Sequence, residues 1–310
     1  MQNKVVVTGG AGFIGSHLTR RLVKEGFNVT VFDSLQLDYG RMDNLKDVLS
    51  EIRYIRGDIR DFNSVVHALK DADMVFHLAA ISHLPICHSN PLQAFEVNYG
   101  GTLNVLEVSR TNSVERVIFA GTDHVYGIPQ YLPIDEKHPY NADDAYSLSK
   151  AQAIELCELY RKNYGMDTRV LISGNVFGES QDPSKVIPIF IGQALKNEPL
   201  TVKGGKQTRD FYYVGNLINA YLLIATGQSL KGAILNVGGD DELSVYELAE
   251  KIIALTESHS KIAKLDYRYD DTSEMRLFLD KNKIIQLGYR TSIKFDEGLK
   301  RTVEWYRRPD

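Results

Sequence analysis

A cluster of four glycines between an apolar run and a helical pattern constrains this chain more than any other feature of its sequence. The stretch "KVVVTGGAGFIGSHLTRRL", residues 4–22, passes from a run of valines directly into Gly9, Gly10, Gly12 and Gly15. Glycine is used where the backbone needs a positive φ or where another group must approach it closely. A strand, such a turn and a helix in immediate succession predict the first unit of an α/β fold in which the turn faces a ligand.

Short apolar and β-branched runs alternate with helical stretches over the first half of the chain. Runs that are apolar throughout are typical of parallel strands covered by helices on both faces, so this alternation predicts a doubly wound α/β fold. The predicted strands cover residues 4–8, 28–32, 52–56, 74–78, 116–121 and 168–173, and the predicted helices cover residues 12–24, 62–70, 92–110 and 144–164.

The glycine turn also has the spacing of a dinucleotide site. Gly9-x-x-Gly12-x-x-Gly15 places backbone N–H groups and a helix N-terminus where a pyrophosphate can approach them. Asp33 follows the next predicted strand, at about the 20-residue offset from which a carboxylate binds the ribose hydroxyls of the adenosine half. Because a carboxylate there repels a 2′-phosphate, the sequence predicts NAD rather than NADP as the cofactor.

The regular alternation of predicted strands and helices ends near residue 171, where the predicted helices become shorter and prolines interrupt the sequence. We therefore expect an NAD-binding Rossmann domain over residues 1–170 and a smaller mixed α/β region over residues 171–310. The segment "AILNVGG" has the composition of a buried strand, and we expect it to return to the large sheet near residues 233–237.

A second group of residues predicts hydride and proton chemistry. Tyr146 and Lys150 are four residues apart on a predicted helix and therefore share a face. A nearby ammonium group and a positively charged nicotinamide both favour phenolate, so we expect Lys150 to lower the pKa of Tyr146 and make it a base. Thr122 follows the strand over residues 116–121, at the edge where such sheets bind ligands, and its hydroxyl can donate to the same substrate oxygen.

The composition excludes several other classes of partner. The 310 residues include 36 Lys and Arg and 40 Asp and Glu, and the net charge of −4 gives no general attraction to nucleic acid or to an anionic membrane. Two cysteines, Cys87 and Cys157, and no apolar run of spanning length lead us to expect a cytoplasmic protein with reduced thiols. The histidines lack ligand spacing such as H-E-x-x-H, so no metal is expected.

Several motifs in a fixed order carry a resemblance that covers nearly the whole chain. They are "TGGAGFIGSHL", "GDIRD", "VFHLAA", "NYGGTLNVLE", "YSLSK", "QTRDFYYV" and "DEGLKRTVEWYR". With these motifs the chain resembles the extended short-chain dehydrogenase/reductase family, in particular its NAD-dependent nucleotide-sugar epimerase and dehydratase group of the UDP-glucose 4-epimerase kind. The resemblance implies a nucleotide-diphosphate sugar as substrate. It also implies a homodimer in which the helices over residues 92–110 and 144–164 pair across a two-fold axis.

The resemblance also assigns residues around the cofactor. Relatives hold the adenine between residues that match Asp58 and Ile59, and they line the rest of the cofactor with residues that follow the fourth strand. The expected cofactor-binding residues are Gly9, Gly12, Phe13, Ile14, Gly15, Asp33, Asp58, Ile59, Leu78, Ala79, Ala80, Asn98, Tyr146 and Lys150.

The same resemblance gives a role to the second region. In relatives, the residues that match Asn175, Arg209 and Arg276 hold the diphosphate of the sugar nucleotide, and guanidinium groups suit phosphate oxygens. His83 stands in the segment that lines the sugar pocket, where relatives often carry serine or a charged residue. The chain also departs from the family before its Asn-x-[Tyr/Phe]-Gly turn, since Ile172 replaces an arginine there.

These assignments predict a 4-epimerase that transiently oxidises C4 of a hexose, with Thr122, Tyr146 and Lys150 at its catalytic centre. Related 4,6-dehydratases carry Thr-Asp-Glu where this chain has Thr122-Asp123-His124, so Asp123 and His124 are also catalytic candidates and dehydration is the alternative reaction. A ketoreductase would prefer NADPH, a sugar-acid decarboxylase carries a glutamate after this strand, and an NAD-binding regulatory protein has no need of the Tyr-Lys pair. We rank these alternatives lower.

Overall fold

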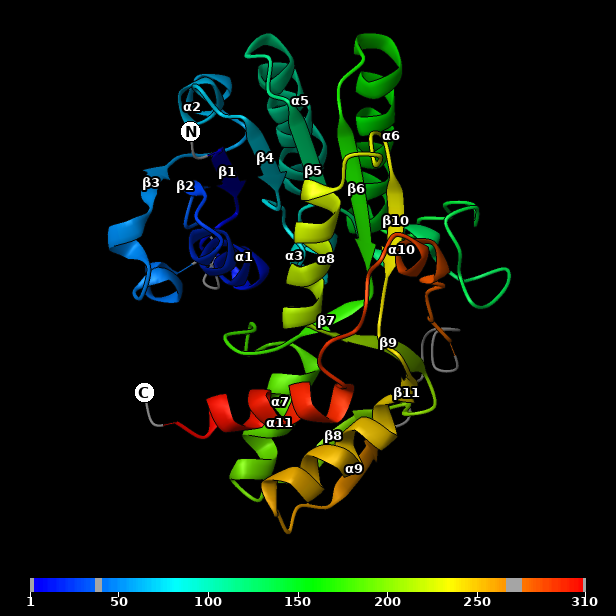
Figure 1. Ribbon diagram of the computed structural model, residues 1–310. Helices are drawn as coiled ribbons and strands as arrows, with labels where there is room; N and C mark the ends of the chain where they lie inside the picture. The colour runs from blue at the N-terminus through cyan, green and yellow to red at the C-terminus, as the bar shows by residue number, and fades with distance from the viewer. Residues whose placement is uncertain (1–2, 37–40, 266–274, 309–310) are drawn as a thin grey trace. The chain divides into compact units, whose positions relative to one another are not determined.

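Apolar runs rich in valine and phenylalanine form the strands of a seven-stranded sheet (Figure 1). The computed structural model describes residues 3–36, 41–265 and 275–308. The strands are β1 (Lys4–Thr8), β2 (Asn28–Asp33), β3 (Arg53–Arg56), β4 (Met74–His77), β5 (Arg116–Ala120), β6 (Thr168–Ser173) and β10 (Ile234–Val237). They lie in the order β10-β6-β5-β4-β1-β2-β3, and the neighbours from β6 to β3 run parallel. The predicted fold class, a doubly wound α/β fold, is confirmed.

The order of the strands reverses at β1, which has β2 on one side and β4 on the other. The pairing of β1 with β4 runs from Val5 opposite Met74 to Thr8 opposite His77, so both strands end at the same edge of the sheet. In open parallel sheets, a reversal of this kind leaves a crevice beyond the carboxyl ends of the strands, where ligands bind. The glycine turn therefore begins at the position where the topology makes room for a ligand.

The chain divides into two compact units that are each made of several segments. Unit 1 comprises residues 1–127, 139–172 and 218–235, and unit 2 comprises residues 128–138, 173–217 and 236–310. This division differs from a single boundary at residue 170, because residues 128–138 belong to unit 2 and residues 218–235 belong to unit 1. Residues 218–235 belong to unit 1 for a physical reason. Arg116 and Arg169 of unit 1 bind carbonyl groups in and just after the last turn of α8 (Val214–Thr226).

The helices of unit 1 are α1 (Phe13–Lys24), α2 (Phe62–Ala68), α3 (Leu84–Ser89), α4 (Pro91–Phe95), α5 (Thr102–Thr111) and α6 (Ala145–Tyr164). Side chains cap the first turns of α2, α4 and α6, whereas α1 begins at Gly12 without a side-chain cap. At the start of α6, the Asp144 carboxylate accepts from the Ser147 backbone N–H at 2.7 Å and the Ser147 hydroxyl accepts from the Asp144 N–H at 3.0 Å. This reciprocal cap fixes the first turn of α6, which carries Tyr146.

The helix expected over residues 92–110 is not one uniform α-helix. A π-helical segment, Glu96–Gly101, separates α4 from α5. Gly101 lies so close to Ile59 that a side chain would overlap it, and the Thr102 hydroxyl donates to the Asn98 carbonyl at 2.5 Å. Insertions of this kind often occur at functional sites, and this one directs the Asn98 side chain into the interior of unit 1.

Unit 2 contains two smaller sheets and the remaining helices. A three-stranded sheet has the order β11-β9-β7, and β8 pairs in parallel with β12. The strands are β7 (Asn175–Phe177), β8 (Leu200–Lys203), β9 (Thr208–Tyr213), β11 (Glu242–Ser244) and β12 (Ile262–Leu265), and the helices are α7 (Val186–Leu195), α9 (Val245–Thr256), α10 (Asn282–Gln286) and α11 (Phe295–Tyr306). Asp210 of β9 is buried and accepts hydrogen bonds from the backbone of Gly239 and Leu279, which ties the later segments to β9.

A buried ion-pair cluster ties the end of α8 to β5 and β6. Asp167 accepts from Arg169 at 2.7 Å and from Arg116 at 3.0 Å, and Arg169 is only 1% exposed. Arg169 also donates to the carbonyl groups of Ile224 and Gly227. Burial raises the pKa of Asp167, but the hydrogen bonds and charges of the two arginines outweigh it, so the pKa lies below its ordinary value.

We predict that Asp167→Asn lowers the free energy of unfolding by about 3 kcal/mol at neutral pH, because Arg169 keeps its charge in a buried place without a counter-ion. A carboxylate whose pKa falls on folding stabilises the native state above its unfolded pKa of about 3.9, and this contribution is lost as the pH falls through the folded value. The difference between wild type and variant should therefore shrink below about pH 4. Urea unfolding followed by circular dichroism measures both effects.

The matched control is Asp43→Asn, which removes an exposed partner of Lys46 and should change the stability little. An Asp167→Asn variant as stable as the Asp43→Asn control at neutral pH would contradict the role of the cluster.

Candidate functional site

The glycine turn after β1 gives close access to the backbone at the point where the strand order reverses. Gly9 has a φ of +70°, and a Cβ at this position would lie 2.7 Å from the backbone nitrogen of Ala79. A Cβ on Gly15 would overlap the carbonyl oxygen of Gly9, so α1 packs directly on the turn. No side chain caps α1 at Gly12, and its first turn holds no acidic residue. An uncapped helix N-terminus of this kind suits the pyrophosphate of a dinucleotide.

A cavity beside this turn lies entirely within unit 1. Its wall consists of Gly9, Gly12, Phe32, Asp33, Ser34, Gln36, Gly57, Asp58, Ile59, Ala79, Ala80, Ile81, Gln93 and Val97. The cavity therefore connects the ends of β1, β2, β3 and β4, as the crevice at a reversal of strand order does. Of the expected cofactor-binding residues, the wall contains Gly9, Gly12, Asp33, Asp58, Ile59, Ala79 and Ala80.

Half of the wall was not foreseen from the sequence. Phe32, Ser34, Gly57 and Ile81 adjoin expected residues at the ends of strands, so the strand ends themselves were a signal for them. Gln36, Gln93 and Val97 carry no such signal, since they reach the cavity through a loop and through the α4 and π-helical segments.

The other expected cofactor residues lie outside this wall. Phe13, Ile14 and Gly15 form the first turn of α1, Leu78 directly follows β4, and Tyr146 and Lys150 lie on α6. Asn98 is 1% exposed, and its amide group bonds to the backbone of Ile81 and to Ser149. Contacts of these residues with a cofactor therefore stay predictions.

Asp33 is held in place by the turn that it faces. One carboxylate oxygen accepts from the Ala11 N–H at 3.0 Å, and the other accepts from the Leu35 N–H at 2.9 Å. Burial raises the pKa of Asp33, and backbone hydrogen bonds from Leu35, Ala11 and Ser34 oppose the rise. Each carboxylate oxygen keeps a lone pair, so the group can still accept hydrogen bonds from ribose hydroxyls.

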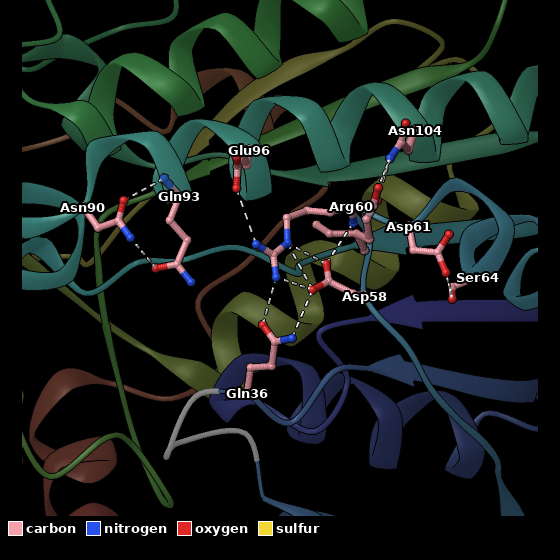
Figure 2. A network of polar contacts seen from close by, with 10 residues as sticks. Gln36, Asp58, Arg60, Asp61, Ser64, Asn90, Gln93, Glu96 and Asn104 are labelled. Carbon is pink, nitrogen blue, oxygen red and sulfur yellow. Dashed lines mark hydrogen bonds and ion pairs between the residues drawn. The ribbon is translucent and has the colours of Figure 1, made fainter.

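A network of polar side chains surrounds Asp58 at the edge of the cavity (Figure 2). Arg60 bonds to both carboxylate oxygens of Asp58, with Nη2 2.7 Å from Oδ2, and reaches Gln36 at 3.3 Å and Glu96 at 3.5 Å. Burial raises the pKa of Asp58, but the bonds and charge of Arg60 hold it below its ordinary value. The guanidinium is thus paired with two carboxylates, and the cavity wall, as far as the structure describes the chain, holds carboxylates but no lysine or arginine.

Thr122, His124 and Tyr146 come together beyond the end of β5. Thr122 caps a 3₁₀ turn, Asp123–Tyr126, and the His124 and Tyr146 rings meet edge to face with centroids 5.7 Å apart. Tyr146 is 9% exposed, and burial raises its pKa well above the ordinary value. A hydrogen bond with Thr122 lowers the pKa of this phenol, whereas the charge of Asp123 raises it. The structure thus brings together four of the five expected catalytic residues around the Tyr146 phenol.

Lys150 lies one turn further along α6 than Tyr146 and is buried. Its Nζ is 4.1 Å from the ring centroid of Phe119, and it influences His77 and Cys157 rather than Tyr146. Burial lowers the pKa of Lys150 to about 7. Burial dominates the pKa of both groups in this structure, and a lowering of the Tyr146 pKa by Lys150 and a charged nicotinamide together stays a prediction.

The residues expected to bind a diphosphate meet on the three-stranded sheet of unit 2. Asn175 pairs with Phe211 of β9, and Arg209 lies on the same strand. A bridge between Thr208 and Arg276 brings the second arginine to the beginning of β9. The Asn175 amide nitrogen is buried and has no hydrogen-bond partner within the part of the chain that the structure describes.

The two arginines differ in what they bind. Arg209 donates to the carbonyl groups of Thr208 and Met275, whereas Arg276 makes a two-pronged ion pair with Glu242 at 2.7 and 2.6 Å. The pair shows that the Arg276 fork is presented in a geometry that suits a planar or tetrahedral anion. His83, the other expected substrate residue, belongs to unit 1, where it precedes α3 and has a buried Nδ1 without a hydrogen-bond partner.

A metal cluster and a membrane-spanning helix are both absent from the residues that the structure describes. No group of three or more His, Cys, Asp or Glu side chains within residues 3–36, 41–265 and 275–308 is arranged to hold a metal ion. Within the same ranges, no helix has the length and apolar character needed to cross a membrane.

Comparisons with known proteins give consistent matches over nearly the whole chain. The model of the NAD dependent epimerase/dehydratase family matches residues 5–238. A protein of Methanocaldococcus jannaschii, provisionally named a UDP-glucose 4-epimerase, is 36% identical over 313 residues that cover 98% of each chain. The human dTDP-D-glucose 4,6-dehydratase is 35% identical over 98% of this chain and 90% of its own. The Thermus thermophilus UDP-glucose 4-epimerase, solved in complex with NAD, is 32% identical with a TM-score of 0.89 over 98% of this chain and 99% of its own.

We predict that the protein binds NAD more tightly than NADP, because a 2′-phosphate would meet the carboxylates of Asp33 and Asp58. Asp33→Asn keeps the size of the side chain and one acceptor but removes its charge. It should reduce the preference for NAD by about tenfold, which corresponds to about 1.4 kcal/mol. Calorimetric titration of both cofactors measures the ratio, with Asp43→Asn as the exposed control. Equal affinity of the unchanged protein for NAD and NADP would refute the assignment of Asp33.

Proposed function

Because the chain belongs to the NAD-dependent epimerase/dehydratase family, we propose that it is a nucleotide-sugar 4-epimerase that transiently oxidises C4 of a hexose. The observation that carries the proposal is the buried phenol of Tyr146, which bonds to Thr122 in the same unit as the NAD cavity. A phenol in this setting can take a proton from a substrate hydroxyl and return it later.

Tyr146 and Thr122 divide the proton chemistry between them. Tyr146 takes the proton of the C4 hydroxyl. Without substrate, the Thr122 hydroxyl opposes the rise in the pKa of the phenol, and with substrate bound its one proton can be donated to the C4 oxygen instead. The cavity beside the glycine turn would hold NAD, which would supply a reversible hydride acceptor for the sugar carbon and a positive charge that favours the phenolate. Lys150 would hold the ribose of the nicotinamide half. After the keto sugar has turned over, Tyr146 returns the proton to the same oxygen.

The residues after Thr122 favour epimerisation over dehydration. A 4,6-dehydratase needs an acid for the C6 hydroxyl and a base for the C5 proton. Asp123 is buried and can serve as the acid, but the position of the expected carboxylate base is taken by His124, whose ring packs against Tyr146. An imidazole at the wall of a sugar pocket is consistent with an epimerase. Dehydration, the reaction named for the human relative, is the second candidate.

We assign the diphosphate of the substrate to unit 2. Arg209 and Arg276 offer guanidinium groups at the beginning of β9, and the buried Asn175 amide nitrogen has no hydrogen-bond partner among the described residues, so it can donate to a ligand. The sugar is assigned to the neighbourhood of Thr122, Tyr146 and His83. The named activities of the relatives, on UDP-glucose and dTDP-D-glucose, support a nucleoside-diphosphate hexose as the substrate.

A panel of UDP-, dTDP-, GDP- and CDP-hexoses tests the proposal. We expect products of unchanged mass that differ from the substrate only in stereochemistry, which chromatography and mass spectrometry resolve together. A product lighter by one water would establish dehydration instead, and its loss in Asp123→Asn would assign the acid.

Tyr146→Phe should lower the turnover number by about 10²- to 10⁴-fold, because it removes the proton acceptor but hardly changes the size of the side chain. The NAD content of the purified variant should remain close to that of the wild type. Tyr246→Phe is the matched control, since this tyrosine lies in unit 2 and packs against Lys264. Activity of Tyr146→Phe within about tenfold of the wild type would remove Tyr146 from the mechanism.

We also propose a homodimer through the outer faces of α5 and α6. Leu148 and Leu159 are eleven residues apart on α6, which is about three turns, so they share one face, and they are 42% and 45% exposed. Leu92 of α4 and Leu103 of α5 are also exposed, by 69% and 38%. Light scattering at micromolar concentration should give twice the mass of the chain, and Leu148→Lys with Leu159→Lys should give the mass of a monomer. A monomeric wild type would contradict this assembly.

A further inference from the structure

Three buried polar side chains lie behind the cofactor cavity and have no part in the proposed mechanism. Thr8 ends β1, His77 ends β4 and Thr102 begins α5, and each is at most 1% exposed. His77 connects them, with Nδ1 2.7 Å from the Thr8 hydroxyl and Nε2 3.0 Å from the Thr102 hydroxyl. A buried imidazole between two hydroxyls can be oriented in only a few ways, so its neighbours determine which nitrogen carries the proton.

Thr8, His77 and Thr102 thus form a chain of hydrogen bonds. The bonds around Thr102 determine which group is the donor at each step of this hydrogen-bond chain. The Thr102 hydroxyl donates its only proton to the Asn98 carbonyl at 2.5 Å, so it can only accept from His77. His77 therefore carries a proton on Nε2. Burial and the nearby charge of Lys150 lower the pKa of His77 to about 3, which keeps the ring neutral and leaves Nδ1 to accept from Thr8.

Both ends of the chain reach groups that matter for the site. The Thr8 hydroxyl accepts from the backbone N–H of Ala79 at 3.2 Å, and Ala79 is part of the cavity wall. At the other end, the Asn98 amide donates to Ser149 at 3.0 Å, and the Ser149 hydroxyl donates to the carbonyl of Tyr146 at 2.8 Å. The Thr102 hydroxyl bonds to the backbone carbonyl of Asn98, and the side-chain amide of the same residue continues to Ser149. The path from the cofactor cavity to the main chain of Tyr146 therefore consists of hydrogen bonds on either side of Asn98 and of the covalent structure of Asn98 between them.

We infer that His77 is a positioning residue whose neutral Nε2–H form fixes the distance between the cavity wall at Ala79 and the turn of α6 that carries Tyr146. The inference rests on the proposed role of Tyr146. His77 touches neither reacting group. It acts because each hydroxyl and amide in the chain has one orientation, so that a change at the imidazole alters the position of the Tyr146 turn.

The packing around His77 leaves it few alternatives. Its ring contacts the ring of Phe119 at a centroid distance of 5.6 Å, and Lys150 Nζ lies 4.1 Å from the centroid of the same ring. A second proton on His77 would place a cation beside that ammonium and would remove the acceptor for Thr8. The neutral ring with one donor and one acceptor satisfies every partner at once.

Substitutions that remove one hydrogen bond at nearly constant volume test the inference. Thr102→Val and Thr8→Val each delete a hydroxyl of the chain, and His77→Leu deletes the imidazole. His77→Gln offers one donor and one acceptor again. The matched controls are Thr19→Val and Ser109→Ala, because these buried hydroxyls have no hydrogen-bond partner.

We expect His77→Leu and Thr102→Val to lower kcat by about 10- to 100-fold, since small displacements of a catalytic group have effects of this size. The KM for the nucleotide sugar that turns over fastest in the panel and the NAD content should change by less than about twofold. His77→Gln should recover most of the lost kcat. A purely structural role predicts instead that the melting temperature falls in all variants while kcat, measured on folded protein, stays at the level of the controls, and this result would overturn the inference.

A spectroscopic measurement tests the direction of the chain without any substrate. In ¹⁵N-labelled protein, the histidine signals that disappear in His77→Gln identify His77 among the eight histidines. They should show the Nε2–H form and remain unchanged between about pH 5 and about pH 9. An Nδ1–H form, or titration in this range, would overturn the inference.

The two readouts separate this inference from the proposed function. If Tyr146→Phe stays active, the role of Tyr146 fails, and with it the positioning role, even though the Nε2–H form is still observed. If Tyr146→Phe is inactive while Thr8→Val and Thr102→Val match their controls in kcat, the positioning role of His77 fails and the proposed function stands.

Discussion

The close approach of Gly9 to the backbone of Ala79 is the contact on which the cofactor site depends. It holds the turn after β1 against the loop after β4, at the one place where the strand order of the sheet reverses. Any side chain at residue 9 would push the two segments apart and close the space that the cavity uses. The Asn98 side chain of the π-helical segment forms two hydrogen bonds with the backbone of Ile81 in the loop after β4. These bonds connect the π-helical segment to the cavity wall.

Patterns that depend on local chemistry could be predicted from the sequence. The strands over residues 4–8 and 168–173 were predicted with the same bounds that the structure gives them, because an apolar run between turn-forming residues has few other stable conformations. Asp33 was found from its offset and lies in the cavity wall. The break in the helix over residues 92–110 was missed, because it depends on the close approach of Gly101 to Ile59, a contact between residues distant in sequence.

The electrostatics of the site were the least predictable part. A spacing of four residues correctly placed Tyr146 and Lys150 on one helix, but it carries no information about burial. Both side chains are almost fully removed from water, and the cost of burying a charge shifts each pKa toward the neutral form. Similarly, no sequence pattern predicts that Arg60 forms ion pairs with Asp58 and Glu96 (Figure 2). These ion pairs determine whether the edge of the cavity attracts or repels a phosphate.

The start of α6 has a consequence for how the chain can vary. In the stretch "YSLSK", Tyr146 belongs to the active-site cluster, Ser147 closes the cap of the helix, Ser149 bonds to the carbonyl of Tyr146, and Lys150 is buried over Phe119. Leu148 is the one member of this stretch with a side chain open to solvent. Each of these four residues thus makes a different contact, so no neighbouring residue can replace the contact that a substitution removes. A substitution at residue 148 leaves the interior of unit 1 unchanged and alters only the surface that we assign to the dimer, whereas a substitution at any of the other four positions changes a buried contact or the cap of α6.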